Sequence, residues 1–189
     1  MRVTPTELPE VLFVEPTVHR DARGLVLETY RRERYVDCGI DVSFVQDNLS
    51  RSGPGVLRGL HLQRDPHSQA KLVYAVTGRV WDVAVDVRAG SPSFGRWAAR
   101  ELAAETMAQL FIPAGFAHGF CVLEAPAVLA YKCSDVHHPE LELTIAHDDP
   151  DLEIAWPIVD PVLSEKDRSA PRLRDVAPEL LPALPQRSR

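Results

Sequence analysis

Residues 56–78, VLRGLHLQRDPHSQAKLVYAVTG, combine the apolar pattern of two strands with an unusual number of polar side chains. The polar residues of this stretch include Arg58, His61, Gln63, Gln69 and Lys71. Polar groups on half-buried strands cost free energy unless they are paired or used. The stretch therefore predicts strands that line a polar cavity rather than a solvated sheet edge.

The spacing of these residues is related to that of a cupin metal site. That site follows the pattern G-x5-H-x-H-x3,4-E-x6-G and, later in the chain, P-x-G-x-x-H. His61 occupies the first ligand position, but Gln63 replaces the second histidine and Lys71 stands where the glutamate would be. The second half is intact as PAGFAH at 113–118. An ammonium group has no lone pair with which to bind a cation, so we expect a metal-free pocket that handles negative charge.

The length and composition favour one all-β domain. The chain has 189 residues, enough for one substantial core, and its 16 prolines and 10 glycines separate short apolar segments as turns do. We expect a cupin-type jelly-roll barrel with a few short helices, formed by residues 1–189 as a single domain. Residues from about 170 to 189 read as a proline-rich C-terminal tail, poorly ordered at its end.

Charge and hydropathy exclude several classes of function. A net charge of −6 argues against bulk nucleic-acid binding, and no apolar run is long enough to span a membrane. The first residues, MRVTPTELPE, lack the apolar core of a secretory signal peptide. The three cysteines have no metal-type spacing and read as reduced thiols. We therefore expect a cytoplasmic protein that binds neither nucleic acid nor membrane.

Two local features follow from strand periodicity. Arg58 and His61 are three positions apart and would point to opposite faces of a regular strand, so Gly59 between them predicts a bulge. Residues 71–76 and 80–87 read as a hairpin that turns at Thr77-Gly78. Alternation over 80–87 predicts a half-buried strand, and 116–123 and 127–134 read as two further strands.

Several residues are candidates for chemistry, each with a plainer alternative. A carboxylate such as Asp167 could orient His61 as a general base, although the two could equally be a core histidine and an unrelated surface aspartate. Tyr131 shares a strand face with Cys133 and could enter the pocket, or could be a buried tyrosine that simply finds a hydrogen-bond partner. Lys71 interrupts an apolar strand, which favours a pocket role. Arg23, Arg58 and Lys166 could bind a phosphate or could be solvated surface charges. We assign no role to His137-His138.

Eight motifs occur along the chain in a fixed order. They are Arg23-Gly24, Gln46-Asp47-Asn48, Arg58-Gly59-Leu60-His61, Gln69-Ala70-Lys71, GSPSFG at 90–95, PxGFAHGF at 113–120, Tyr131-Lys132 and LSEKD at 163–167. With these motifs the chain resembles the dTDP-4-dehydrorhamnose 3,5-epimerases, from about Phe13 to about Asp167. Two positions depart from that family: Leu62 replaces its aromatic residue, and ELTIAH at 142–147 replaces its E-x-G-I-x-W.

The resemblance implies a metal-independent jelly-roll homodimer without a cofactor. Its reaction would be epimerisation of dTDP-4-dehydro-6-deoxy-D-glucose at C3 and C5, through an enolate, to dTDP-4-dehydro-L-rhamnose. His61 would be the base with Asp167 behind it, Tyr131 the acid on the opposite face of the sugar, and Lys71 the cation at the 4-keto oxygen. The nucleotide sugar would be bound by Arg23, Glu28, Gln46, Asp47, Asn48, Arg58, His118, Glu142 and Lys166, with Arg23 and Glu28 reaching the partner's pocket.

Three other functions stay open at this point. Single-site epimerases of antibiotic deoxysugars share almost all of these motifs. A non-epimerising sugar-nucleotide-binding cupin, such as a 3,4-ketoisomerase-like protein, would be expected to lack the combination of His61, Tyr131 and Asp167. A metal-dependent cupin oxygenase is opposed by Gln63 and Lys71 at ligand positions.

Overall fold

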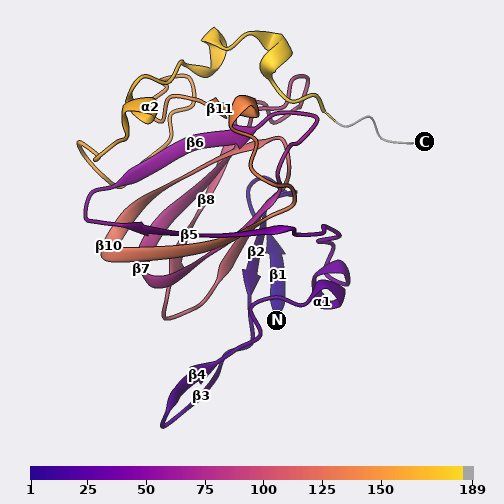
Figure 1. The fold of residues 1–189 in the computed structure, drawn as a ribbon, viewed down its shortest axis with the longest axis vertical. Coiled ribbons are helices and arrows are strands. Elements are labelled where there is room, and N and C mark those ends of the chain that lie inside the picture. The colour runs from indigo at the N-terminus through magenta and orange to yellow at the C-terminus, as the bar shows by residue number, and fades with distance from the viewer. Residues whose placement is uncertain (185–189) are drawn as a thin grey trace.

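Two long strands, β7 (Lys71–Asp86) and β10 (Phe116–Cys133), form the centre of the fold. The computed structural model describes residues 1–184, and within them β7 and β10 pair in antiparallel fashion along most of their length. They belong to a nine-stranded sheet of order β1-β2-β9-β7-β10-β6-β11, in which β5 also pairs with β10 and β8 with β7. The result is the expected all-β barrel (Figure 1). The other strands of this sheet are β1 (Arg2–Pro5), β2 (Leu12–Glu15), β5 (Gln46–Ser52), β6 (Leu57–Gln63), β8 (Trp97–Ala103), β9 (Gln109–Ile112) and β11 (Glu142–Thr144).

The predicted hairpin at Thr77-Gly78 is wrong, because β7 runs through these residues without reversing. Gly78 has φ +69°, and a Cβ atom there would lie 2.4 Å from the carbonyl oxygen of Glu124. The glycine therefore bends the strand where β10 passes very close. β10 is also a single strand rather than two, and its register against β7 shifts between Val122 and Leu129, beside the bend.

The second half of β7 is buried on both faces, so the prediction of a half-buried strand is also wrong. Val80 and Ala84 pack inside the barrel. Val83 and Val85 are buried in a second apolar cluster, which also contains Leu173 and Val176 of the C-terminal segment. Periodicity within 80–87 could not reveal this cover, because the covering segment lies far away in the sequence.

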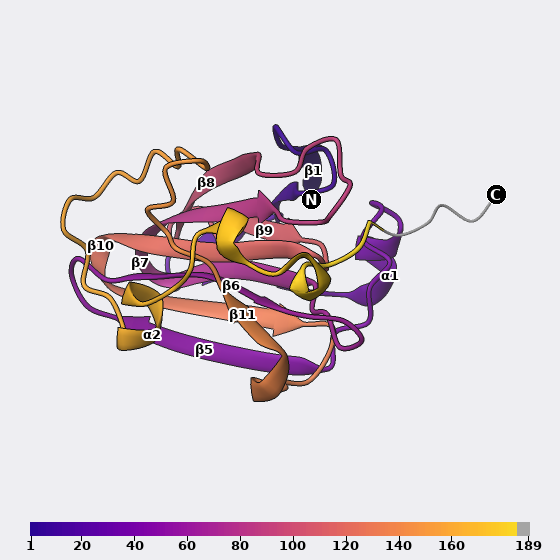
Figure 2. The same cartoon turned by 90° about the horizontal axis from the view of Figure 1, so that it is seen from above.

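The helices are few and short, as expected. They are α1 (Arg32–Val36), α2 (Glu165–Arg168) and the 3₁₀ turns η1 (Pro139–Leu141), η2 (Leu173–Asp175) and η3 (Pro178–Leu180). The yellow C-terminal segment that carries α2, η2 and η3 lies over β6 and β11 (Figure 2). The proline-rich segment from 170 therefore packs on the barrel over its described part, and the expectation of poor order at its end concerns residues 185–189, outside the described residues. Within residues 1–184, no helix is long and apolar enough to cross a membrane.

A small hairpin made of β3 (His19–Asp21) and β4 (Gly24–Val26) projects away from the barrel (Figure 1). All residues of both strands are exposed. The apolar side chains of Leu25 and Val26 are among them. A two-stranded hairpin buries too little apolar surface to be stable alone in water, and the described part of the chain places no other element against this one.

Candidate active site

His61 is aimed by the bulge that the sequence predicts. Along the β6–β10 pairing, His61 lies opposite His118 and Arg58 lies opposite Phe120, so β6 contains one residue more than β10 between these pairs. Gly59 has φ +135°, and a Cβ atom there would lie 2.5 Å from the Cα of Gly119. Only glycine fits this close approach of two backbones. The bulge at Gly59 is therefore confirmed. Because of it, the side chains of Arg58 and His61 need not point to opposite faces of β6.

Asp167 reaches His61 from helix α2. The Ser164 hydroxyl caps that helix by accepting from the Asp167 backbone N–H at 3.1 Å. The Nε2 atom of His61 donates to Asp167 Oδ1 at 2.5 Å, and the Asp167 side chain is only 3% exposed. Burial alone would raise the pKa of Asp167, but the hydrogen bond and charge of His61, together with Ser164, lower it overall. An ionised carboxylate can only accept, so Nε2 of His61 carries the proton and Nδ1 is free to act as a base.

The two members of this pair, far apart in sequence, are thus in direct contact, and His61 borders a cavity of about 280 Å³. The cavity opens between the strands β5, β6, β7, β10 and β11. Its lining residues are Gln46, Asn48, His61, Leu62, Gln63, Gln69, Lys71, Tyr131, Cys133, His137 and Glu142.

Lys71 places its amino group at the wall of the cavity. It lies beside Cys133 on β10, and Cys133 in turn lies beside Gln46 on β5. Burial lowers the pKa of Lys71, opposed by the nearby groups Cys133, Asp82 and Glu142. Within residues 1–184, no hydrogen bond or ion pair involves its ammonium group. An ammonium without a partner at a cavity wall is suited to bind an anionic oxygen.

Tyr131 lines the same cavity from β10, between Asn48 on β5 and Val73 on β7. Burial raises the pKa of its phenol, helped by Cys133 and opposed by Arg58. The phenol is therefore protonated at neutral pH and can act as an acid. No group among residues 1–184 accepts a hydrogen bond from it, so the plain alternative of a buried tyrosine with a protein partner finds no support.

Two of the three residues in the Gln46-Asp47-Asn48 motif face the cavity. Gln46 donates to the side chain of Asn48 at 3.1 Å, and both line the cavity. Asp47 points to the opposite face, where it forms an ion pair with Lys132 at 2.8 Å and its side chain is 71% exposed. The structure thus separates the Asp47 carboxylate from the cavity, as strand alternation requires.

Polar residues at the cavity rim are already paired. Glu142 accepts a hydrogen bond from Lys166 at 2.7 Å. Burial alone would raise the pKa of Glu142, but Lys166 and His61 lower it overall. Arg58 is exposed and donates to the hydroxyl of Ser52 at 3.1 Å. Of these charged groups, Glu142 lines the cavity, Lys166 is joined to it through Glu142, and Arg58 is not among the lining residues.

His118 belongs to a second, buried histidine–aspartate pair. Its Nε2 lies 3.0 Å from each carboxylate oxygen of Asp82, and the Asp82 side chain is fully buried. His118 is not among the residues that line the cavity. Asp82 is not among the predicted site residues, although its carboxylate in the apolar strand 80–87 was a signal, because buried acids need a partner.

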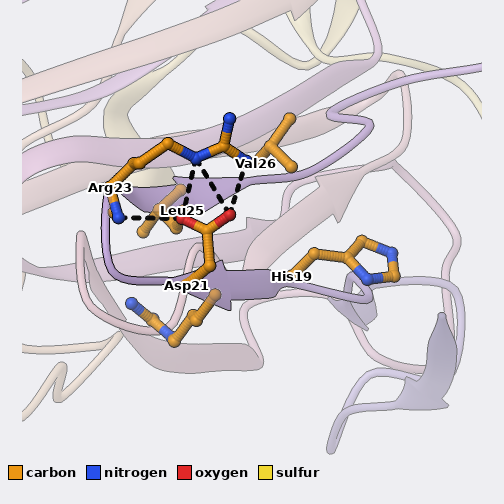
Figure 3. A pocket seen from close by; sticks show the side chains of 7 residues that line it. His19, Asp21, Arg23, Leu25 and Val26 are labelled. Atoms are coloured by element: carbon orange, nitrogen blue, oxygen red, sulfur yellow. Dashed lines mark hydrogen bonds and ion pairs between the residues drawn. The ribbon is translucent and has the colours of Figure 1, made fainter.

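Arg23 and Glu28 do not reach the cavity of their own chain. Arg23 lies on the projecting hairpin, 89% exposed, and pairs with Asp21 at 2.5 Å (Figure 3). A separate surface hollow of about 410 Å³ surrounds these residues. Glu28 pairs with Arg31 at 3.6 Å and Arg34 at 3.1 Å. Both predicted ligand contacts are therefore remote from the other site residues in one chain.

The fold and the site together define a class: a cupin-type barrel with acid–base groups in its cavity and a lysine at a metal-ligand position. Comparison with known proteins agrees. A model of the family described as dTDP-4-dehydrorhamnose 3,5-epimerase matches residues 5–175. A dTDP-4-dehydrorhamnose 3,5-epimerase from Pseudomonas aeruginosa is 50% identical over 177 residues, which cover 93% of this chain and 97% of the relative. The chain belongs to the dTDP-4-dehydrorhamnose 3,5-epimerase family, and it is therefore an isomerase.

Solved structures agree with this assignment and confirm the cupin-type fold. The dTDP-6-deoxy-D-glucose-3,5-epimerase of Legionella pneumophila, in complex with dTDP-4-keto-L-rhamnose, superposes with a TM-score of 0.94. It is 46% identical, over 98% of this chain and 99% of that chain. A 3'-monoepimerase from Streptomyces bikiniensis, in complex with dTDP-quinovose, gives a TM-score of 0.90 at 38% identity, over 95% of this chain and 92% of that chain.

Proposed function

We propose that this protein converts dTDP-4-dehydro-6-deoxy-D-glucose to dTDP-4-dehydro-L-rhamnose by inverting C3 and C5. The observation that carries the proposal is the His61–Asp167 pair at the edge of a cavity that also contains Lys71 and Tyr131. Family membership supports the choice of substrate, and a relative of 46% identity binds the product of this reaction.

The roles of the residues follow from the chemistry of a carbon next to a ketone. Nδ1 of His61 takes the proton from C3 or C5, and the electron pair moves into an enolate at C4. The ammonium of Lys71 stabilises the enolate oxygen, which is the largest electrostatic contribution available in this cavity. Tyr131 then donates its phenolic proton to the opposite face of the carbon, which inverts the configuration. The oxidation state of the sugar is unchanged, so no redox cofactor is required.

The nucleotide part of the substrate is bound by groups outside this acid–base cluster. We assign Gln46, Asn48 and Glu142, which line the cavity, to the sugar nucleotide. Lys166, which is paired with Glu142, and Arg58 are assigned with them by family resemblance. Asp47 and His118 would take part only after a rearrangement or through their backbone, because their side chains face other partners.

The functional unit is a homodimer in this proposal. Arg23 and Glu28 are placed with the substrate by family resemblance, yet they lie on or beside a hairpin that projects from the barrel. A partner copy would bring its hairpin, with exposed Leu25 and Val26, over this chain's cavity and bury those apolar side chains. The site would then contain residues from both subunits.

Complementation between inactive variants tests the composite site. Arg23→Ala and His61→Asn chains, each impaired alone, are co-expressed with different tags, and mixed dimers are isolated. Each mixed dimer contains one site with both wild-type residues, so about half of the wild-type activity per dimer should return. A matched mixture of Lys71→Ala and His61→Asn should recover nothing, since both residues come from one chain. Failure of the first mixture to recover activity, or full activity in a monomer, would exclude the shared site.

A single-site epimerase is the second candidate, favoured by the similarity to a 3'-monoepimerase at a TM-score of 0.90. Solvent deuterium incorporation into the 4-keto sugar nucleotide, followed by NMR, separates the two. Label at both C3 and C5 is the expected result, whereas label at one carbon supports the single-site reaction and no label excludes an epimerase. The proposal places the enzyme in the cytoplasm, supported by the free thiols of Cys38, Cys121 and Cys133.

A further inference from the structure

Two loops meet beside the cavity and are joined by Gln63. These loops are residues 64–70, between β6 and β7, and residues 134–141, between β10 and β11. The amide nitrogen of Gln63 donates to the carbonyl oxygens of His67 at 2.5 Å and Val136 at 3.0 Å. Its amide oxygen accepts from the backbone N–H of His138 at 2.7 Å. The buried glutamine therefore fixes the backbones of both loops at the points that carry their histidines.

These loops place His67, Asp135 and His138 against one another. Nδ1 of His67 lies 2.9 Å from Asp135 Oδ2. The rings of His67 and His138 are stacked, with centroids 4.0 Å apart and an interplanar angle of 21°. One potential ligand atom from each of the three residues lies within 4.8 Å of the others. Two imidazoles and a carboxylate are a common donor set for Zn²⁺.

The dimensions are close to those of a metal site. Bonds of about 2.0–2.1 Å to a tetrahedral Zn²⁺ place ligand atoms roughly 3.3 Å apart, against the 4.8 Å within which the three atoms lie here. A bound ion lies in the plane of each ligating imidazole, so the stacked rings of His67 and His138 would turn toward a common point on binding. Glu140 lies 3.2 Å from Nδ1 of His138 and can orient that ring, as carboxylates behind ligand histidines do. The three side chains are partly exposed, which provides an entry path and leaves a fourth position for water.

We propose that His67, Asp135 and His138 form a binding site for a divalent transition-metal ion, best matched by Zn²⁺, that clamps the two loops together. The site is distinct from the cupin ligand positions, where Lys71 stands. It lies next to the cavity, because Gln69, which donates to the Asp135 carbonyl at 2.8 Å, and His137 both line the cavity. The bound ion would hold this part of the cavity rim in place without taking part in the proton transfers.

Titration of the full-length, chelator-treated protein with Zn²⁺ tests the site. Calorimetry should give one ion per chain, and Co²⁺ in its place should give the visible absorption of a tetrahedral site. His138→Ala and Asp135→Asn should remove stoichiometric binding. Glu140→Gln should weaken it about 10–100-fold, as expected for a group that orients a ligand. His147→Ala, a change at a histidine outside both the cavity lining and the cluster, should bind as the wild type does.

Two further measurements keep the test independent of folding and of catalysis. Imidazole ¹H–¹⁵N spectra of the wild type should show the resonances of His67 and His138 shifting together at one equivalent of Zn²⁺. The melting temperature of the wild type, but not of His138→Ala, should rise with Zn²⁺ concentration. Absence of stoichiometric binding by the wild type would overturn the proposal. So would unchanged binding by both ligand variants, and neither result depends on whether the protein epimerises a sugar.

Discussion

Replacing Asp167 by asparagine probes the base directly. The Asp167 carboxylate is 3% exposed and accepts from His61 Nε2 at 2.5 Å, so it is well placed to stabilise the imidazolium that forms when His61 takes a proton. A hydrogen bond to a charged group contributes about 1.5–3 kcal/mol. Its loss should lower kcat about 10- to 150-fold. If the asparagine NH₂ instead faces Nε2, the proton of His61 moves to Nδ1 and the loss should approach about 10⁴-fold, the loss found when the aspartate of a Ser-His-Asp triad is replaced by asparagine.

The assay for this variant is deuterium incorporation at C3 and C5 under saturating substrate. KM should change little, because Asp167 contacts His61 and does not line the cavity. Asp148→Asn is the matched control: its carboxylate lies 3.9 Å from another histidine, His147, away from the cavity. That control should exchange at the wild-type rate. Wild-type exchange in Asp167→Asn, with an unchanged melting temperature, would refute the role of the carboxylate behind the base.

Three other predictions follow from the same structure. Lys71→Ala should suppress exchange as severely as His61→Asn while dTDP still binds, and rapid exchange in this variant would show that the ammonium does not stabilise the enolate. Burial would raise the pKa of Asp86, but hydrogen bonds from Arg88 and two serines lower it from 3.8 to about 2. The stability this provides, about 2 kcal/mol, is present above pH 4 and should be lost as pH falls toward about 2. Urea unfolding should therefore show this loss in the wild type and not in Asp86→Asn. Exhaustive chelation of His138→Ala, which lacks the proposed loop site, should leave its turnover intact, because no acid–base step requires a metal. An activity of this variant that returns only with added metal would contradict the pocket chemistry.

Local sequence patterns were sufficient wherever the deciding forces act between neighbouring residues. The three-residue spacing of Arg58 and His61, which would put them on opposite faces of a regular strand, indicated a bulge. Gly59 forms this bulge because the backbone of Gly119 passes too close for any side chain. Lys71 at a ligand position indicated a pocket that handles negative charge, and Lys71 does line the cavity, with no hydrogen-bond or ion-pair partner among residues 1–184.

Sequence patterns failed where residues distant in the chain decide the outcome. A Thr-Gly pair such as Thr77-Gly78 is compatible with a hairpin turn and with a bend inside a strand. Which of the two forms here depends on β10, which passes alongside. The burial of Val83 depends on Leu173 and its neighbours in the C-terminal segment. The cluster of His67, Asp135 and His138 comes from two loops with no characteristic spacing, so only the fold reveals it.

The most direct test of the proposed chemistry compares solvent exchange with inversion in Tyr131→Phe. Loss of the general base in His61→Asn should lower exchange at both carbons by about 10²–10⁴-fold. Tyr131→Phe removes only the proton donor on the other face, so His61 should continue to take the proton and return deuterium to the same face. We therefore expect exchange to persist in Tyr131→Phe while net inversion falls. If Tyr131→Phe stops exchange as completely as His61→Asn does, base and acid do not act on opposite faces of the sugar.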